Sequence, residues 1–195
     1  MAGRPREFDI DTALDRAIEV FFKKGYEKAS LDDLTSAMNI KRPSLYKAFG
    51  NKETLFRTAL ETYHDRDLNQ LRTLLSSEAN PIKGVEVALL AIANNHIETK
   101  LGCLIANSGN MVHNDEGYDE IQEMLQKLIQ NNEDTLYTHF ESAKEHGYLS
   151  QDEDERALAQ YFNGVLQGMA VIGRINNSSE ALLNIAHQAI RIISD

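Results

Sequence analysis

The chain has 195 residues, 42% of them hydrophobic, a formal net charge of -10 and a single cysteine, Cys103. This length and apolar content argue for one large or two modest packed domains and against intrinsic disorder. One cysteine excludes an intrachain disulfide and a thiolate zinc cluster within one chain, which fits a reducing, cytoplasmic setting. The longest apolar run, residues 87–93, is far shorter than the ~20 residues of a membrane-spanning helix, so no membrane partner is expected.

The charge is divided unevenly along the chain. Residues 1–60 hold 11 Lys and Arg against 9 Asp and Glu, whereas residues 61–195 hold 9 against 21. Because phosphate neutralisation by Lys and Arg supplies most of a protein's non-specific affinity for DNA, only the first part is suited to approach a duplex. The sequence therefore predicts two parts with different partners.

The first sixty residues predict three short helices. Apolar residues recur at three- and four-residue spacing from residue 10 to residue 22, and Gly25 is a natural stop for that helix. Ser30 and Asp33 have the spacing of a capping box that opens a second helix. A third helix begins near residue 41 or 42, with Pro43 in its first turn, and ends at Gly50.

Helical periodicity continues to the end of the chain, and no strand-like alternation is found. Asn51 caps a fourth helix that runs to about Ser76, on which His64 is expected at the surface. Further helices are predicted at about 82–100, 102–113, 117–146, 152–174 and 179–193. The fold class is therefore all-α, with an N-terminal helix-turn-helix domain at 1–50 and a helical domain at 51–195.

A basic face lies on the predicted third helix, because residues 41–52 contain four Lys and Arg and no Asp or Glu. The second helix of a helix-turn-helix enters the major groove of DNA, and its N-terminal residues meet base edges. Arg42 can pair with a guanine, Pro43 can contact a thymine methyl group and Ser44 can bond a base or a phosphate. The groups placed for the phosphate backbone or the adjacent minor groove are Arg4, Arg6, Lys41, Tyr46, Lys47 and Lys52. The alternative is an ordinary solvated helix face.

About fifty contiguous residues resemble the DNA-binding domain of the tetracycline-repressor (TetR) family: Phe21, Gly25-Tyr26, Ser30, Leu34, Ile40, Ser44-Leu-Tyr-Lys-Ala-Phe49 and Asn51-Lys-Glu-Thr-Leu55. The resemblance implies about nine helices, a homodimer, a ligand-binding C-terminal domain and repression of a DNA operator that a small-molecule effector relieves. It implies that Tyr46 and Lys52 clamp the backbone, and it adds Ser30 to the DNA-binding set. Asn39 and Pro43 stand where the family often has Gly. Asn tolerates the left-handed conformation that the turn needs, whereas Pro43 changes the surface that faces the groove.

The resemblance places the homodimer interface in residues 152–193, and the sequence is compatible with this. Gly164, Gly168 and Gly173 leave little side chain on part of one helix, which permits close approach. Ordinary core packing explains the apolar residues of these two helices equally well. An effector pocket is expected among the fifth to eighth helices, with these candidates: His96, Cys103, Asn107, Met111, His113, Tyr118, Tyr137, Phe140, Phe162, Asn163 and Met169. Each is also an ordinary core candidate.

The sequence contains no pattern of catalytic residues, no paired metal-ligand spacing and no cofactor fingerprint, so none of these is expected. The hypothesis is a ligand-responsive repressor that binds a palindromic operator as a homodimer. Two alternatives stay open. One is a repressor that senses oxidants or electrophiles through Cys103, and the other is an all-helical small-molecule-binding or catalytic protein whose N-terminal motif is only structural.

Overall fold

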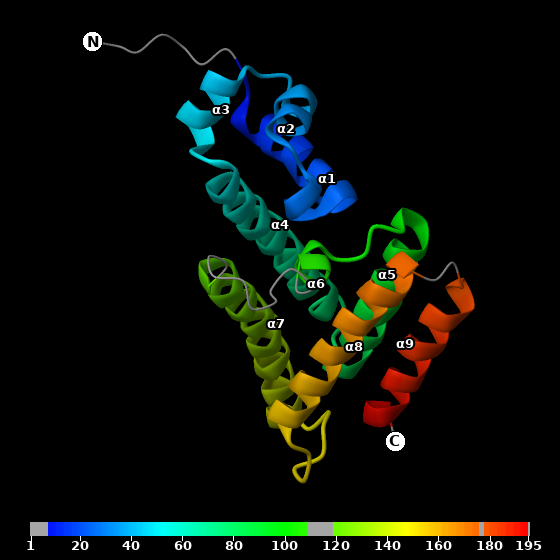
Figure 1. The fold of residues 1–195 in the computed structure, drawn as a ribbon. Coiled ribbons are helices and arrows are strands. Elements are labelled where there is room, and N and C mark those ends of the chain that lie inside the picture. The colour runs from blue at the N-terminus through cyan, green and yellow to red at the C-terminus, as the bar shows by residue number, and fades with distance from the viewer. Residues whose placement is uncertain (1–7, 109–118, 176–177, 195) are drawn as a thin grey trace. The chain divides into compact units, whose positions relative to one another are not determined.

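The computed structural model describes residues 8–108, 119–175 and 178–194, and within these ranges every regular element is a helix (Figure 1). The nine helices of the described ranges confirm the all-α prediction. In chain order they are α1 (Ile10–Lys28), α2 (Leu31–Met38), α3 (Arg42–Phe49), α4 (Lys52–Leu75), α5 (Pro81–Thr99), α6 (Leu104–Ser108), α7 (Asp119–Glu145), α8 (Glu155–Ile175) and α9 (Ser179–Ser194).

The chain separates into two compact units, Met1–Tyr63 and His64–Asp195. Their boundary falls inside α4, later than the boundary at residue 50 that the sequence suggested. The first turns of α4 belong to the N-terminal unit because their apolar side chains complete its core. The ring of Phe56 on α4 packs on that of Phe21 on α1, with centroids 4.8 Å apart, and Phe56 is fully buried.

Local interactions set the ends of α2 and α3 where the sequence placed them, whereas α1 continues one turn past the predicted stop at Gly25. In α1, Gly25 leaves the helical conformation at φ 72°, so the helix is kinked there and its last turn ends at Lys28. Ser30 and Asp33 form the predicted capping box of α2. In α3, Pro43 lies in the first turn, where its missing N–H costs nothing, and Gly50 ends the helix at φ 77°.

The C-terminal unit is built around one apolar cluster. Buried residues of α5, α7, α8 and α9 meet there with Leu71 and Leu75 from the end of α4, and Phe140, Phe162 and Met169 lie at its centre. In this unit α8 packs against α5, α7 and α9, and α5 packs along α9 (Figure 1). None of the described helices has the length and apolarity to span a membrane.

The expectation for His64 is wrong. Its side chain is only 1% exposed, and within the described part of the chain neither ring nitrogen has a hydrogen-bond partner. The physical reason is helical register, because His64 lies four residues from both Leu60 and Leu68, which are buried on the same stripe of α4.

Candidate nucleic-acid interface

The turn between α2 and α3 has the geometry of a helix-turn-helix. Asn39 adopts the left-handed conformation at φ 54°, and its backbone N–H donates to the carbonyl oxygens of Ser36 and Thr35. Asn is one of the few residues that take this conformation at small cost, so the turn forms without the glycine that the family often has. The short turn brings the start of α3 beside α2.

The α3 side chains follow the predicted inner and outer faces except for Ser44, which was expected to project outward. Leu45 and Phe49 are buried and fix the inner face of the helix, while Ser44 is half-buried. The opposite face is exposed and brings together Lys41, Arg42, Pro43, Tyr46 and Lys47. This face holds three cations and, as α3 itself contains no acidic residue, it can approach a polyanion.

A groove of about 620 Å³ lies beside this face and includes polar residues of α2 that the sequence analysis missed. Its lining also includes backbone and side chains at the turn and the start of α3. The sequence could have indicated that α2 contributes to the groove, since α2 precedes the turn in any helix-turn-helix. It could not indicate which α2 residues reach the groove, because that depends on the packing of α2 on α3. The lining residues are Phe8, Asp32, Thr35, Ser36, Asn39, Ile40, Lys41 and Ser44.

Ion pairs organise the start of α2. The Nη2 of Arg42 donates to the Oδ1 of Asp32 across 2.8 Å. Lys24 of α1 pairs with Asp33 at 2.6 Å. The backbone N–H and the hydroxyl of Ser30 donate to the same carboxylate, and the backbone N–H of Asp33 donates to the Oγ of Ser30. The ammonium of Lys24 and then the hydrogen bonds from Ser30 lower the pKa of Asp33 to about 2. Ser30, a predicted DNA-binding residue, therefore serves the helix start in this structure.

Lys52 is held against its own unit. Its Nζ lies 4.4 Å from the centroid of the Tyr26 ring and 3.3 Å from the carbonyl oxygen of Glu27. Partial burial lowers the pKa of Lys52, and the charge of Glu27 opposes that shift. A phosphate contact by Lys52 would therefore be made from this anchored position. Arg4 and Arg6 lie outside the described residues.

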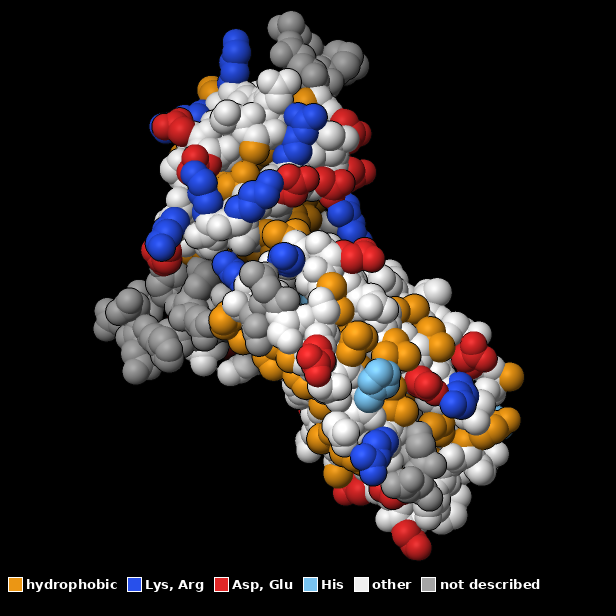
Figure 2. Space-filling model, turned by 90° about the vertical axis from the view of Figure 1, so that its right-hand side faces the viewer, with side chains coloured by type: hydrophobic (Ala, Val, Ile, Leu, Met, Phe, Trp, Pro, Cys, Tyr) orange, Lys and Arg blue, Asp and Glu red, His pale blue; other side chains and the backbone are white. Residues whose placement is uncertain are grey.

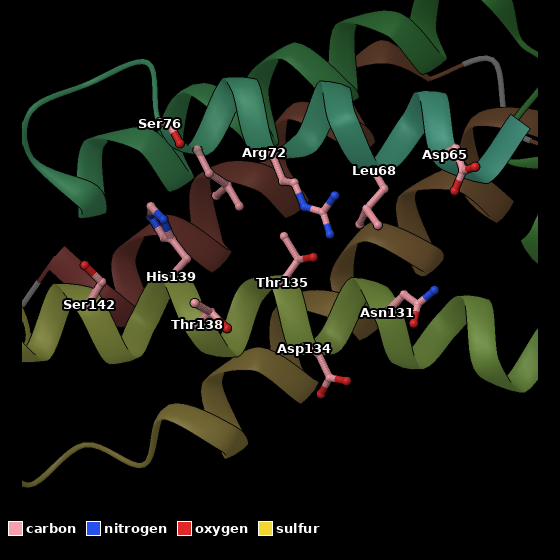
Figure 3. Close-up of a pocket in the computed structure, with 11 residues that line it drawn as sticks. Asp65, Leu68, Arg72, Ser76, Asn131, Asp134, Thr135, Thr138, His139 and Ser142 are labelled. Atoms are coloured by element: carbon pink, nitrogen blue, oxygen red, sulfur yellow. The ribbon is translucent and has the colours of Figure 1, made fainter. Parts of the chain in front are cut away.

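The C-terminal unit contains a cleft of about 800 Å³ between the second half of α4 and α7 (Figure 3). Figure 3 shows the guanidinium of Arg72 pointing from α4 toward Thr135 of α7. The lining is mixed, with hydroxyl, amide and charged groups beside leucine side chains: Asp65, Leu68, Arg72, Leu75, Ser76, Asn131, Asp134, Thr135, Thr138, His139 and Ser142.

The sequence candidates for an effector pocket lie elsewhere in this unit, and none of those described lines the cleft. Phe140, Phe162 and Met169 are core residues, and the two phenyl rings pack with centroids 5.3 Å apart. The remaining described candidates take three different positions. Tyr137 stacks under Arg156, Cys103 and Asn107 are half-buried just before and within α6, and His96 and Asn163 are buried. Met111, His113 and Tyr118 fall outside the described residues.

Two of these buried candidates carry a polar atom that is not paired. Within the described residues the Nδ1 of His96 and the Oδ1 of Asn163 have no hydrogen-bond partner, although the Nδ2 of Asn163 donates to the carbonyl oxygen of Ile129. Burial of an unpaired polar atom is costly, so such atoms mark candidate ligand contacts.

The described residues contain no group of three or more His, Cys, Asp or Glu that could hold a metal ion.

The fold and the exposed cationic face of α3 together define a helix-turn-helix DNA-binding protein. Residues 13–59 match the profile described as "Bacterial regulatory proteins, tetR family". The chain is 36% identical over 97% of its length to the HTH-type transcriptional repressor ComR of Escherichia coli K12, 91% of which is covered. It is also 30% identical to the HTH-type transcriptional regulator YezE of Bacillus subtilis 168, over 92% of this chain and 93% of that protein. The chain belongs to the tetR family of transcriptional regulators.

Solved structures agree with this assignment. A cysteine mutant of the TetR family transcriptional regulator CifR, complexed with 26-bp double-strand operator DNA, superposes with a TM-score of 0.88 and 33% identity. The match covers 96% of this chain and 98% of that one. These comparisons favour a transcriptional regulator over the alternative in which the N-terminal motif is only structural, because the matched relatives are named HTH-type transcriptional regulators.

Proposed function

We propose that this regulator is a repressor that binds a palindromic DNA operator as a homodimer and is released by a small-molecule effector. The observation that carries the proposal is the exposed face of α3. Arg42 and Lys47 are exposed on this face, and the buried side chains of Leu45 and Phe49 hold the opposite face of the helix in the core. ComR is named a repressor, and CifR is complexed with operator DNA, which supports the same action here. A repressor of this kind would be located in the cytoplasm, where the DNA that it binds is found.

On DNA, the start of α3 would read bases and its neighbours would hold phosphates. Arg42 would make a bidentate contact to guanine, and Pro43 and Ser44, which follow it at the N-terminal end of α3, would contact neighbouring groups. Lys41, Tyr46, Lys47 and Lys52 would contact the backbone, which fixes register without reading sequence.

A homodimer would use the exposed face of α8. Three hydrophobic side chains of this face are exposed, of which Ile175 is 80% exposed. The two glycines between them have open space around them, since a Cβ at either position would meet nothing within 4 Å. Figure 2 views the C-terminal unit from the side on which α9 lies and shows hydrophobic side chains across it. The residues recur at three- and four-residue spacing, as one stripe requires: Tyr161, Gly164, Gly168, Val171 and Ile175.

The cleft between α4 and α7 is the site that we propose for the effector. It is large enough for a small molecule and offers both leucine surface and hydrogen-bonding groups. The buried unpaired atoms of His96 and Asn163 are a second set of candidate contacts. Because α4 contributes Arg72 to the cleft and Phe56 to the core of the N-terminal unit, displacement of α4 by a ligand would reach the DNA-binding helices. Coupling energies of this kind are typically about 1–3 kcal/mol.

DNA binding is tested by fluorescence anisotropy with the region upstream of the chain's own gene and an unrelated duplex of equal length. We expect a preference for the former, lost in Arg42→Ala and reduced in Tyr46→Ala, with unchanged melting temperatures. Lys83→Ala is the matched control, because Lys83 is an exposed cation of α5 paired with Glu86. Equal affinity of the wild type for every duplex would refute the proposal.

Effector release is tested with a reporter gene placed behind the operator and a library of small molecules. Any compound that relieves repression should stop acting on Thr135→Trp, which fills the cleft, while this variant still represses. Relief that persists in Thr135→Trp would move the effector site away from the cleft, toward His96 and Asn163.

Cysteine-based sensing is a second candidate. Cys103 is half-buried at the start of α6 and follows Gly102, whose positive φ of 71° sets the chain direction there. Treatment with N-ethylmaleimide would then abolish DNA binding by the wild type and leave Cys103→Ser unaffected. Full alkylation of Cys103 without loss of DNA binding would eliminate this candidate.

A further inference from the structure

An acidic side chain stands on the surface that we propose for DNA. Asp32 lines the groove beside α3 together with Lys41 and Ser44, and its carboxylate lies 2.8 Å from the Nη2 of Arg42. A carboxylate at a DNA-facing surface repels phosphates and lowers non-specific affinity. We therefore expect an interaction of Asp32 that offsets this loss of affinity for DNA.

Stability of the fold supplies only a small part of this offset, through the favourable position of a negative charge in the first turn of α2. The side chain of Asp32 is 80% exposed and that of Arg42 is 54% exposed, and ion pairs with such exposure contribute little to folding. The start of α2 is held by Ser30 and Asp33 through the capping box, and by Lys24 through its pair with Asp33. The carboxylate of Asp32 is thus available to a neighbour on another helix.

The geometry suits Asp32 to orient the guanidinium of Arg42. The capping box fixes the backbone of Asp32 within the first turn of α2, and Arg42 is the first residue of α3. A guanidinium is planar and has five donor N–H groups, so binding at one Nη leaves others free for a base. Restricting a long side chain before binding lowers the entropy that is lost when it meets its target.

We propose that Asp32 is a specificity-determining positioning residue that holds Arg42 in the orientation needed to read one guanine in each half-site. The inference rests on the proposed base-reading role of Arg42. Asp32 lowers affinity for DNA in general and raises discrimination at one base pair, so its two effects have opposite signs. A residue that served only the fold would not produce that pattern.

The test is selection of bound sequences from a pool of randomised duplexes, followed by affinity measurements on the selected site and its single-base variants. Asp32→Asn should reduce the preference at one base pair per half-site by roughly 2- to 5-fold, the range that an exposed ion pair can supply, and bind unrelated DNA as well as or better than the wild type. Arg42→Ala should lose preference at the same base pair, and adding Asp32→Asn to it should change that preference no further.

Glu19→Gln is the matched control, since Glu19 is an exposed carboxylate of α1 that pairs with Lys23; its base preferences should equal those of the wild type. The inference is overturned if Asp32→Asn leaves every base preference unchanged, or if its effect persists in the absence of Arg42. A wild-type protein that enriches no motif would instead refute the proposed DNA recognition, and this inference with it.

Discussion

Three histidines are held in environments that disfavour their charged form. Burial lowers the pKa of His64, His96 and His139; for His64 the charge of Asp65 opposes the shift, and for His139 the hydrogen bond to the carbonyl oxygen of Pro81 opposes it. In the unfolded chain a histidine takes up its proton near its ordinary pKa of about 6.5. Between that value and the lower pKa of the folded state, the unfolded chain binds more protons.

The free energy of unfolding should therefore fall as the pH drops from about 7.5 through 6.5 toward 5.5. His64→Leu should show a smaller fall, because one of the responsible groups is gone. At pH 7.5 this variant should be as stable as the wild type or more stable by about 1 kcal/mol, since two unpaired buried nitrogens are removed. Urea unfolding at the two pH values measures both effects, and an identical pH dependence in the variant would contradict the assignment.

For single residues, the sequence was sufficient where exposure depends on neighbours within one helix. The exposure of Arg42 and Lys47 follows from the burial of Leu45 and Phe49 on the same short helix. The pair between Asp32 and Arg42 was not predictable, because the residues are ten apart and their distance depends on how α2 meets α3. His64 was predicted at the surface, although its spacing from Leu60 and Leu68 already favoured the buried stripe.

At the scale of elements, helix ends were predictable because caps are short-range interactions. Asn51 accepts the N–H of Thr54 at the start of α4, and Asn80 accepts that of Ile82 at the start of α5, both close to the predicted boundaries. The cleft was not predictable, since its walls are α4 and α7 and its width is set by tertiary packing. For the same reason the position of Thr135 opposite Arg72 has no sequence signal.

Two glycines of α8 should respond to alanine in opposite ways. A Cβ at Gly168 meets nothing within 4 Å, so Gly168→Ala should raise the stability of the monomer by roughly 0.5–1 kcal/mol through better helix propensity. A Cβ at Gly173 would lie 2.8 Å from the Cβ of His96, so Gly173→Ala should destabilise the C-terminal unit by about 1–3 kcal/mol. Chemical denaturation at low protein concentration measures the two differences.

The proposed dimer adds a second consequence for Gly168. If this stripe of α8 meets its twofold partner, Gly168→Leu should shift sedimentation from dimer to monomer while the helical circular dichroism is retained. Gln126→Leu, an exposed change on α7 that also adds apolar surface but lies outside residues 152–193, is the comparison. A wild-type protein that sediments as a monomer at all concentrations would contradict the proposed assembly.

For the whole molecule, the charge distribution predicts a strong dependence of DNA binding on salt. Net positive charge is confined to the first sixty residues of a chain with a net charge of -10, so binding depends on a small number of Lys and Arg contacts to phosphate. A dimer that makes about 6–10 such contacts should lose about 10³–10⁵ in affinity between roughly 50 and 200 mM salt. Anisotropy titrations over this range measure how the logarithm of the affinity falls with the logarithm of the salt concentration. Lys47→Ala should make this dependence less steep. An affinity that does not change with salt would contradict the phosphate contacts.

The most direct test of the central claim, that two copies of α3 read DNA, is hydroxyl-radical footprinting of the selected duplex. We expect two protected segments related by a dyad and separated by about one helical turn or a multiple of it. Protection should vanish in Arg42→Ala and remain in Lys83→Ala. A single protected segment, or uniform protection along the duplex, would contradict recognition by a twofold pair of α3 helices.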